Sequence, residues 1–186
     1  SLVGSEMCIR DRYLTFVTKH HDGVAFWNSK VSDYTYGNLS GTHFDVLKCL
    51  KEKCEKHGIV LCAYYSQWLD WGDMNGRNND LDYADEQKTH FDRIAAGRGE
   101  IDAPYRQLPT EEAYDKYWRE KAMPQVAELI KEYGVKLFWF DCWRADPVAE
   151  GQMTEKQMRD MLAMIRQLDP TVLVNTRCLL YTSPSP

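Results

Sequence analysis

Strand-like and helix-like stretches alternate along this chain, and this alternation constrains the fold more than any other feature. The strand-like stretches are short and rich in β-branched and aromatic residues, whereas the stretches between them carry apolar residues at spacings of three and four. Such an alternation is typical of a parallel sheet whose strands are joined by right-handed helical crossovers. The predicted strands are Tyr13–Lys19, Ile59–Tyr65, Val135–Phe140 and Thr171–Asn175, and the predicted helices span residues 42–57, 111–133 and 154–168.

Local signals define the ends of these helices. Thr42 and Asp45 suggest a capping arrangement for the first helix, and Thr154 and Gln157 have the spacing of a capping box for the third. Pro124 lies inside the second helix, where it should produce a kink or divide the helix in two.

The alternation fits either a closed barrel or an open sheet. No glycine-rich turn of the GxGxxG or GxxxxGK type follows a predicted strand, which weakens the nucleotide-binding open sheet. A complete (β/α)8 barrel takes about 250 residues. We therefore predict an α/β fold that is a partial (β/α)8 TIM-type barrel, with four parallel strands alternating with three helices. The long polar connection from Asp70 to Pro109 would lie on its catalytic rim, either as a substrate-shaping loop or as a mobile surface loop.

Both ends of the chain resemble translated sequencing-adapter tails, which often flank fragmentary metagenomic reading frames. We expect residues 1–12 and 178–186 to be non-native and residues 13–177 to form the partial barrel. The alternative is a native arm and a flexible Ser-Pro tail.

Composition excludes several classes of function. The formal net charge is −5 and the isoelectric point is near 5.5, which argues against a nucleic-acid or anionic-membrane partner. No apolar run approaches the roughly 20 residues of a membrane-spanning helix. No secretion signal is visible, so the location of the full-length protein stays open, with the periplasm and the cell exterior as candidates. The six cysteines form no CxxC pair, and we expect packing residues or free thiols, although disulfides between distant cysteines stay open.

Polar side chains follow each predicted strand. In a closed parallel barrel these strand ends meet at one mouth, where they can surround a single small, hydroxyl-rich molecule. The groups are His20-His21-Asp22, Tyr64-Tyr65-Ser66, Asp141, and Asn175 with Arg177.

Asp141 is the strongest candidate for a reacting group, because it ends the aromatic run Phe138-Trp139-Phe140. A carboxylate beside indole rings suits sugar chemistry, whereas a lone Asp at this position would only cap the following loop. The adjacent imidazoles of His20 and His21 raise a metal site as a rival interpretation. Neighbouring strand residues face opposite sides, so we expect no metal here and assign both rings to hydrogen bonds with sugar hydroxyls, with Asp22 holding one imidazole tautomer.

These groups resemble a known family, the alpha-L-fucosidases of glycoside hydrolase family 29. The similarity extends from Tyr13 to Arg177 and keeps the order and rough spacing of the motifs. It is carried by Thr18-Lys19-His20-His21-Asp22-Gly23, Tyr64-Tyr65-Ser66, Leu69-Asp70-Trp71, Trp139-x-Asp141 and Val174-Asn175-x-Arg177.

The resemblance implies a role for each matching residue. Asp141 would be the catalytic nucleophile, His20 and His21 would bind fucose hydroxyls, Tyr64 and Trp139 would line the pocket, and Arg177 would line the same site. The implied reaction is the retaining removal of terminal alpha-L-fucose from a fucosylated oligosaccharide or glycoconjugate, through a glycosyl-aspartate intermediate and without a cofactor. Val24 departs from the family, which commonly has an aromatic residue there.

Retention needs a second carboxyl group as acid and base. In the family this group follows the strand that holds Arg177, where the recognisable sequence ends, so we assign none. Asp146 and Glu150 are better explained as solvated loop charges. We therefore expect the fragment to be inactive and poorly stable by itself. A barrel hydrolase for another sugar and a non-catalytic carbohydrate-binding descendant are the alternatives.

Overall fold

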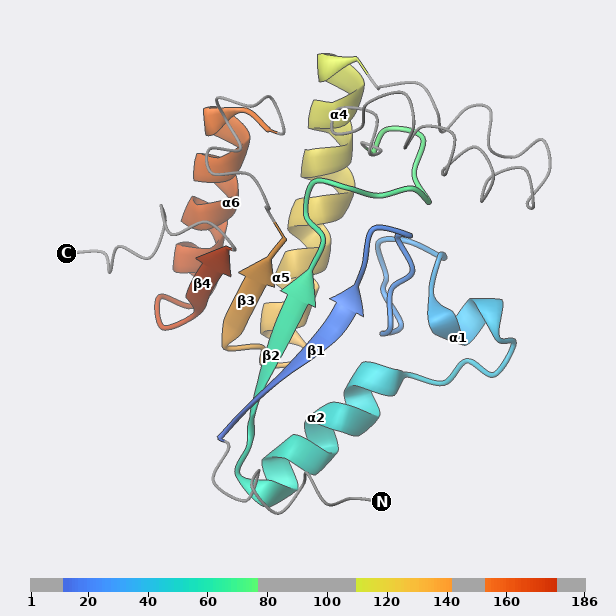
Figure 1. Ribbon diagram of the computed structural model, residues 1–186, viewed down its shortest axis with the longest axis vertical. Coiled ribbons are helices and arrows are strands. Elements are labelled where there is room, and N and C mark those ends of the chain that lie inside the picture. Colours follow the sequence, from blue (N-terminus) through green and yellow to red (C-terminus); the bar gives the residue numbers. More distant parts are fainter. Residues whose placement is uncertain (1–11, 77–109, 142–152, 177–186) are drawn as a thin grey trace, which may run out of the picture.

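The computed structural model describes residues 12–76, 110–141 and 153–176 (Figure 1). Each of the four predicted strands is present, with its ends within two residues of the expected positions. In chain order the elements are strand β1 (Tyr13–Lys19), helix α1 (Tyr36–Leu39), helix α2 (Val46–His57), strand β2 (Val60–Tyr65), helix α4 (Glu111–Tyr117), the π-helical segment η5 (Trp118–Ala122), helix α5 (Met123–Lys131), strand β3 (Leu137–Phe140), helix α6 (Glu155–Leu168) and strand β4 (Leu173–Thr176).

The four strands form one sheet in the order β1-β2-β3-β4. All three neighbouring pairs are parallel, and α4, α5 and α6 lie behind the sheet in Figure 1. The predicted parallel α/β architecture is therefore confirmed. Among the described residues, none of the helices combines the length and the apolar character that crossing a membrane requires.

Apolar side chains from the sheet and the helices form the core. Buried aromatic residues of β2 and β3 face the buried side chains of α5 and α6, and Phe138 and Phe140 stack with ring centroids 5.4 Å apart. Burying these side chains is the main favourable contribution to folding. The core from these four elements includes Ala63, Tyr65, Phe138, Phe140, Val126, Leu129, Ile130, Met161 and Ile165.

The helix boundaries follow the local signals only in part. Asp45, not Thr42, caps α2, accepting a hydrogen bond from the backbone N–H of Lys48. The predicted capping box of α6 is present, with Thr154 and Gln157 bonded to each other's backbone. The short helix α1 was not predicted, because four residues carry no recognisable period.

The predicted helix over residues 111–133 is divided, as Pro124 led us to expect. The π-helical segment η5 separates α4 from α5, and Pro124 lies in the first turn of α5. Proline has no N–H to donate and its ring crowds the preceding turn, so a locally wider turn removes the conflict.

A β-bulge in β1 changes the direction of its last side chains. Val17 pairs with Tyr64, but Lys19 pairs with Tyr65, so one extra residue, Thr18, is inserted between the two pairs. Lys19 consequently turns to the helix-covered face, where its Nζ lies 4.6 Å from the centre of the Tyr65 ring. The chain then continues into His20 at the carboxyl end of the strand.

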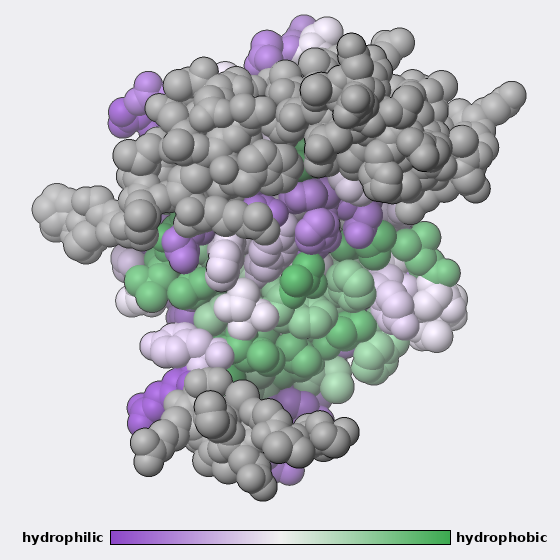
Figure 2. Space-filling model, viewed as in Figure 1, coloured by the Kyte–Doolittle hydropathy of each residue, from purple (hydrophilic) through white to green (hydrophobic). Residues whose placement is uncertain are grey.

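On the opposite face of the sheet, several of the described side chains are open to solvent. Val17, Trp139 and Leu173 on this face are 42%, 38% and 57% exposed. The surface in the same view is apolar over the strands and hydrophilic nearer their carboxyl ends (Figure 2). This open face leads directly to the predicted mouth.

Candidate active site

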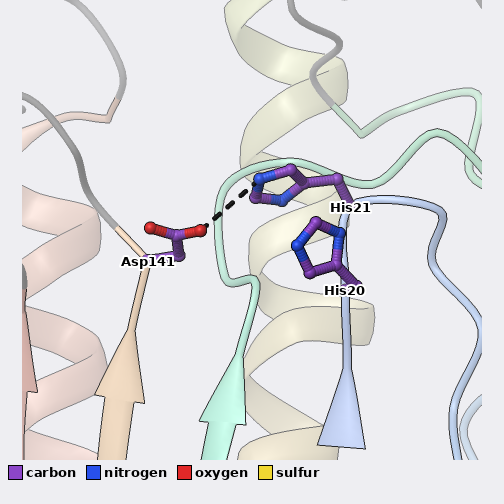
Figure 3. Close-up of side chains that lie close together, drawn as sticks. All are labelled: His20, His21 and Asp141. Carbon is purple, nitrogen blue, oxygen red and sulfur yellow. Dashed lines mark ion pairs between the residues drawn. The ribbon is translucent and has the colours of Figure 1, made fainter. Parts of the chain in front are cut away.

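The carboxyl ends of β1 and β3 bring three predicted site residues together (Figure 3). His20 and His21 follow β1, and Asp141 follows β3. Ligand atoms from all three side chains lie within 4.8 Å of one another. The sequence argument against a metal assumed that the two histidines face opposite sides, and this was wrong because both lie beyond the last residue of the strand.

Asp141 is held from several directions. Its side chain is 1% exposed, and its Oδ2 accepts a hydrogen bond from the Tyr64 hydroxyl. The same oxygen lies 3.5 Å from Nε2 of His21. The indole N–H of Trp68 donates to the backbone carbonyl of Asp141 at 2.8 Å, which fixes the main chain at the point where β3 ends.

Ser66 determines the tautomer of His21. The single hydroxyl proton of Ser66 is donated to the carbonyl oxygen of Leu69 at 2.9 Å. Nδ1 of His21, 2.7 Å from the Ser66 oxygen, must therefore be the donor of that bond. In the neutral ring Nε2 then carries a lone pair, and this nitrogen is the one that faces Asp141.

The prediction that Asp22 holds an imidazole was wrong. Oδ1 of Asp22 accepts the backbone N–H of Val24 at 2.8 Å, which closes a local turn. Ser66 takes the expected role from the neighbouring strand end. Sequence proximity suggested Asp22, whereas the parallel pairing of β1 with β2 supplies the actual partner.

Aromatic rings surround the two histidines. The ring of His20, which is exposed, stacks on Tyr64 with centroids 5.4 Å apart and an interplanar angle of 9°. The ring centroids of His20 and His21 are 4.1 Å apart, and those of His21 and Trp71 are 5.9 Å apart. Such rings can cover the apolar face of a small ligand while the imidazole nitrogens contact its polar groups.

A row of directly paired residues on β2, β3 and β4 extends this site across the open face. Tyr64 pairs with Trp139, and Trp139 pairs with Asn175. Directly paired residues of a parallel sheet present their side chains on the same face. The structure thus places Tyr64 and Trp139 side by side below the His20–His21–Asp141 cluster, with Asn175 next in the row. Arg177, Asp146 and Glu150 lie outside the described residues.

Comparison with known proteins places the chain in a family. The sequence model of the alpha-L-fucosidase family matches residues 11–183. The chain belongs to the alpha-L-fucosidase family. No curated protein was found to match it.

Solved structures of alpha-L-fucosidases share its fold. The unliganded AlfC enzyme from Lactobacillus casei is 30% identical, with a TM-score of 0.67 over 93% of this chain and 48% of the AlfC chain. AlfC in complex with its alpha-L-fucose product is 29% identical, with a TM-score of 0.65 over 93% and 48%. A family 29 enzyme from Bacteroides thetaiotaomicron is 25% identical, with a TM-score of 0.60 over 88% and 30%. The chain thus spans about half the length of AlfC, which agrees with the predicted partial barrel.

A buried charge network lies behind the site and was not predicted. We call it the Lys19–Asp70–Lys121 network. Oδ2 of Asp70 accepts hydrogen bonds from Lys19 Nζ at 2.9 Å and from Lys121 Nζ at 3.0 Å. Lys121 also reaches Asp73 at 3.2 Å, and Lys19 donates to the Tyr117 hydroxyl at 2.9 Å. Lys19 and Asp70 belong to the motifs shared with the fucosidases, and a charged residue ending an apolar strand was the available signal.

Burial and pairing act against each other in this network. Burial alone would raise the pKa of Asp70, but the two ammonium groups outweigh it and hold the pKa below 3.8. Burial would lower the pKa of Lys121, yet Asp70 and Asp73 keep it above the usual value. For Lys19, complete burial prevails over the attraction of Asp70 and lowers its pKa. Asp70 is therefore the anion that both cations share.

Backbone hydrogen bonds hold the loop that follows β1, residues 20–23, beside this network. The carbonyl of His21 accepts the N–H of Trp71 at 2.7 Å, and that of Lys19 accepts the N–H of Ser66 at 3.0 Å. Gly23 has φ +83°, and a Cβ there would lie 2.1 Å from Oδ1 of Asp70. The close approach of this loop to Asp70 therefore requires glycine at position 23.

Proposed function

We propose that the full-length protein is a retaining exo-glycosidase that hydrolyses terminal alpha-L-fucose, with Asp141 as its nucleophile. The observation that carries this proposal is the position of the Asp141 carboxylate. It is nearly buried, bonded to the Tyr64 hydroxyl and opposite His21, at the end of the strand where the open face begins. Membership of the alpha-L-fucosidase family gives the chemistry to which this position belongs.

In the proposed first step, an oxygen of Asp141 forms a bond to the anomeric carbon of fucose. The bond from that carbon to the leaving oxygen breaks, and an acid/base group protonates the leaving oxygen. Water then attacks the glycosyl-aspartate, gives a proton to the same group and releases fucose with retained configuration. The two carboxyl groups of such enzymes stand about 5 to 5.5 Å apart. We assign the second group to none of the described residues, so we expect this chain by itself to be inactive.

We assign recognition of the sugar to the side chains around Asp141. The ring nitrogens of His20 and His21 suit bonds to fucose hydroxyls, and the ring faces of Tyr64 and Trp139 suit the apolar side of the sugar and its methyl group. Variants of AlfC have been solved with Fuca(1,6)GlcNAc and with 4-nitrophenyl-a-L-fucopyranoside. Fucosylated oligosaccharides or glycoconjugates are therefore the proposed substrate class, and Arg177 is the further pocket residue proposed by family resemblance.

The contact between Tyr64 and Asp141 adds a role to Tyr64 beyond lining the pocket. A hydroxyl that donates to the nucleophile holds the carboxylate in one orientation and stabilises it again when the glycosyl-enzyme bond breaks. Removing this donor would slow both steps, while the ring that stacks on His20 would stay in place.

The test uses the protein completed from its native gene, because the chain spans about half of AlfC. Asp141→Gly should reduce kcat on an aryl alpha-L-fucoside by more than about a thousandfold, as loss of a nucleophile does. The control is Asp33→Gly, which removes an exposed loop carboxylate. Turnover by Asp141→Gly close to that of Asp33→Gly would show that the nucleophile is assigned wrongly.

A panel of aryl glycosides tests the sugar separately. The expected result is the highest kcat/KM on the alpha-L-fucoside. Higher kcat/KM on a galactoside or a xyloside would mean a barrel hydrolase for another sugar, and tight sugar binding without turnover would mean a carbohydrate-binding descendant.

A further inference from the structure

We propose that His20, His21 and Asp141 also form a binding site for a borderline divalent cation, Zn²⁺ above all, which excludes a sugar from the same mouth. The donor set is two imidazoles and one carboxylate from the ends of β1 and β3, with ligand atoms within 4.8 Å of one another. Imidazole nitrogens and carboxylate oxygens are ordinary ligands of Zn²⁺. Binding of the ion does not depend on the sugar chemistry above, whereas its competition with a sugar rests on the proposed function.

The protonation pattern around His21 favours a cation. Ser66 fixes the proton on Nδ1, so the neutral ring presents a lone pair at Nε2, 3.5 Å from an oxygen of the Asp141 carboxylate. A nitrogen with a lone pair and a carboxylate oxygen are both atoms that coordinate a divalent cation.

The spacing agrees with that of zinc ligands. In a tetrahedral site with Zn–N and Zn–O distances of about 2.0 to 2.2 Å, two ligand atoms are about 3.4 Å apart. His21 Nε2 and Asp141 Oδ2 are 3.5 Å apart, so an ion can bridge them without movement of the backbone. The exposed ring of His20 needs only a side-chain rotation to become the third ligand, and water can supply the fourth.

Groups around the ligands complete this arrangement. Metal-binding histidines usually donate their second N–H to a protein acceptor, and ligating carboxylates usually accept a further hydrogen bond. Here the Ser66–Leu69 chain serves His21, and the Tyr64 hydroxyl serves Asp141. The third ligand, His20, is exposed, and the donor atoms are up to 4.8 Å apart, so they must move closer together to bind an ion. We therefore infer reversible binding that competes with the sugar.

Calorimetric titration of the completed protein with Zn²⁺ tests the proposal, since binding does not require turnover. His20→Gln is the main variant, because His20 is exposed and its replacement leaves the core unchanged. The matched control is His57→Gln, which changes an exposed histidine at the end of α2. We expect His20→Gln and Asp141→Asn to weaken Zn²⁺ binding at least tenfold, and His57→Gln to leave it unchanged.

Ser66→Ala gives a second, independent measurement. It keeps all three ligands and removes the hydroxyl that accepts from His21 and donates to Leu69, so we expect Zn²⁺ affinity to fall about 10- to 100-fold. Binding to thiols contributes equally to every variant and cancels in these comparisons. Equal Zn²⁺ affinity of the original protein, His20→Gln and Asp141→Asn would overturn the proposal, as would a loss of the same size in His57→Gln.

Discussion

Asp70→Asn is the substitution that should reveal most about how this fold is held together. Asn has nearly the same shape and keeps the Oδ1 atom that accepts the Gly72 N–H at 3.1 Å. It replaces the carboxylate that Lys19 and Lys121 contact at 2.9 and 3.0 Å with a neutral group. The change therefore removes one charge without creating a cavity.

The expected cost follows from the burial of the partners. The side chains of Lys19 and Asp70 are completely inaccessible. Removing one member of a buried ion pair costs about 3 to 5 kcal/mol, because the remaining charge is left desolvated. Lys121 retains Asp73 at 3.2 Å, so Lys19 bears most of the loss. Since whole domains have a free energy of unfolding of about 5 to 15 kcal/mol, this one change should remove a large share of the stability.

Urea unfolding followed by far-UV circular dichroism measures the effect, in the completed protein and in this chain. Asp160→Asn is the matched control, because Asp160 pairs with Lys156 on the surface of α6, and loss of such a pair costs at most about 0.5 kcal/mol. If Asp70→Asn lowered the free energy of unfolding no more than Asp160→Asn, the charge network would not stabilise the fold.

The pH dependence of the same variant has a definite sign. Burial lowers the pKa of Lys19 below 10.5, and without Asp70 the pKa should fall further. The unfolded state then binds more protons than the folded state, so the stability of Asp70→Asn should rise as pH approaches 10.5. On the acid side, the contribution of Asp70 is present above pH 3.8 and is lost as pH falls through its lowered pKa, so the variant and the original protein should converge there.

Substitutions at three further positions test separate parts of the fold by the same urea measurement. Leu129→Ala in the core of α5 should lower the free energy of unfolding by about 2 to 5 kcal/mol, because Leu129 is fully buried; a loss below that range would mean that the helix is loosely packed. Gly58→Ala should cost about 1 kcal/mol, because Gly58 ends α2 at φ 65° with open space around it, and Gly58→Asn should recover part of this loss. Thr154→Ala should cost about 1 kcal/mol by removing the cap of α6, whereas Thr154→Ser, which keeps the hydroxyl, should be close to neutral.

Sequence signals predicted the strands and the longer helices of this fold, because these elements bury a recognisable pattern of apolar residues, but not the four-residue helix α1. They could not predict the bulge at Thr18, since one inserted residue leaves the composition of the strand unchanged while reversing the side that Lys19 faces. The division of the helix near Pro124 was predictable, because the missing N–H of proline is a local property. The π-helical form of the preceding turn was not predictable.

Convergence of the site was predictable because carboxyl ends of parallel strands meet at one edge of a sheet. His20, His21, Tyr64 and Asp141 accordingly come together. The partner of His21 was not predictable, because it depends on which residue of β2 lies beside the end of β1. The Lys19–Asp70–Lys121 network was not predicted for the same reason. Both partners of Lys19 lie at least 51 positions from it in the sequence.

The bulge in β1 constrains the evolution and engineering of this segment. Lys19 and His20 are consecutive, yet one belongs to the interior and the other to the mouth, and Lys19 reaches the interior because Thr18 is extra in the pairing. If Thr18 took a regular place in the ladder, Lys19 would turn to the open face, and its ammonium group would stand over the ligand. Designs that graft the two histidines onto another barrel should therefore keep this irregular pairing together with Lys19.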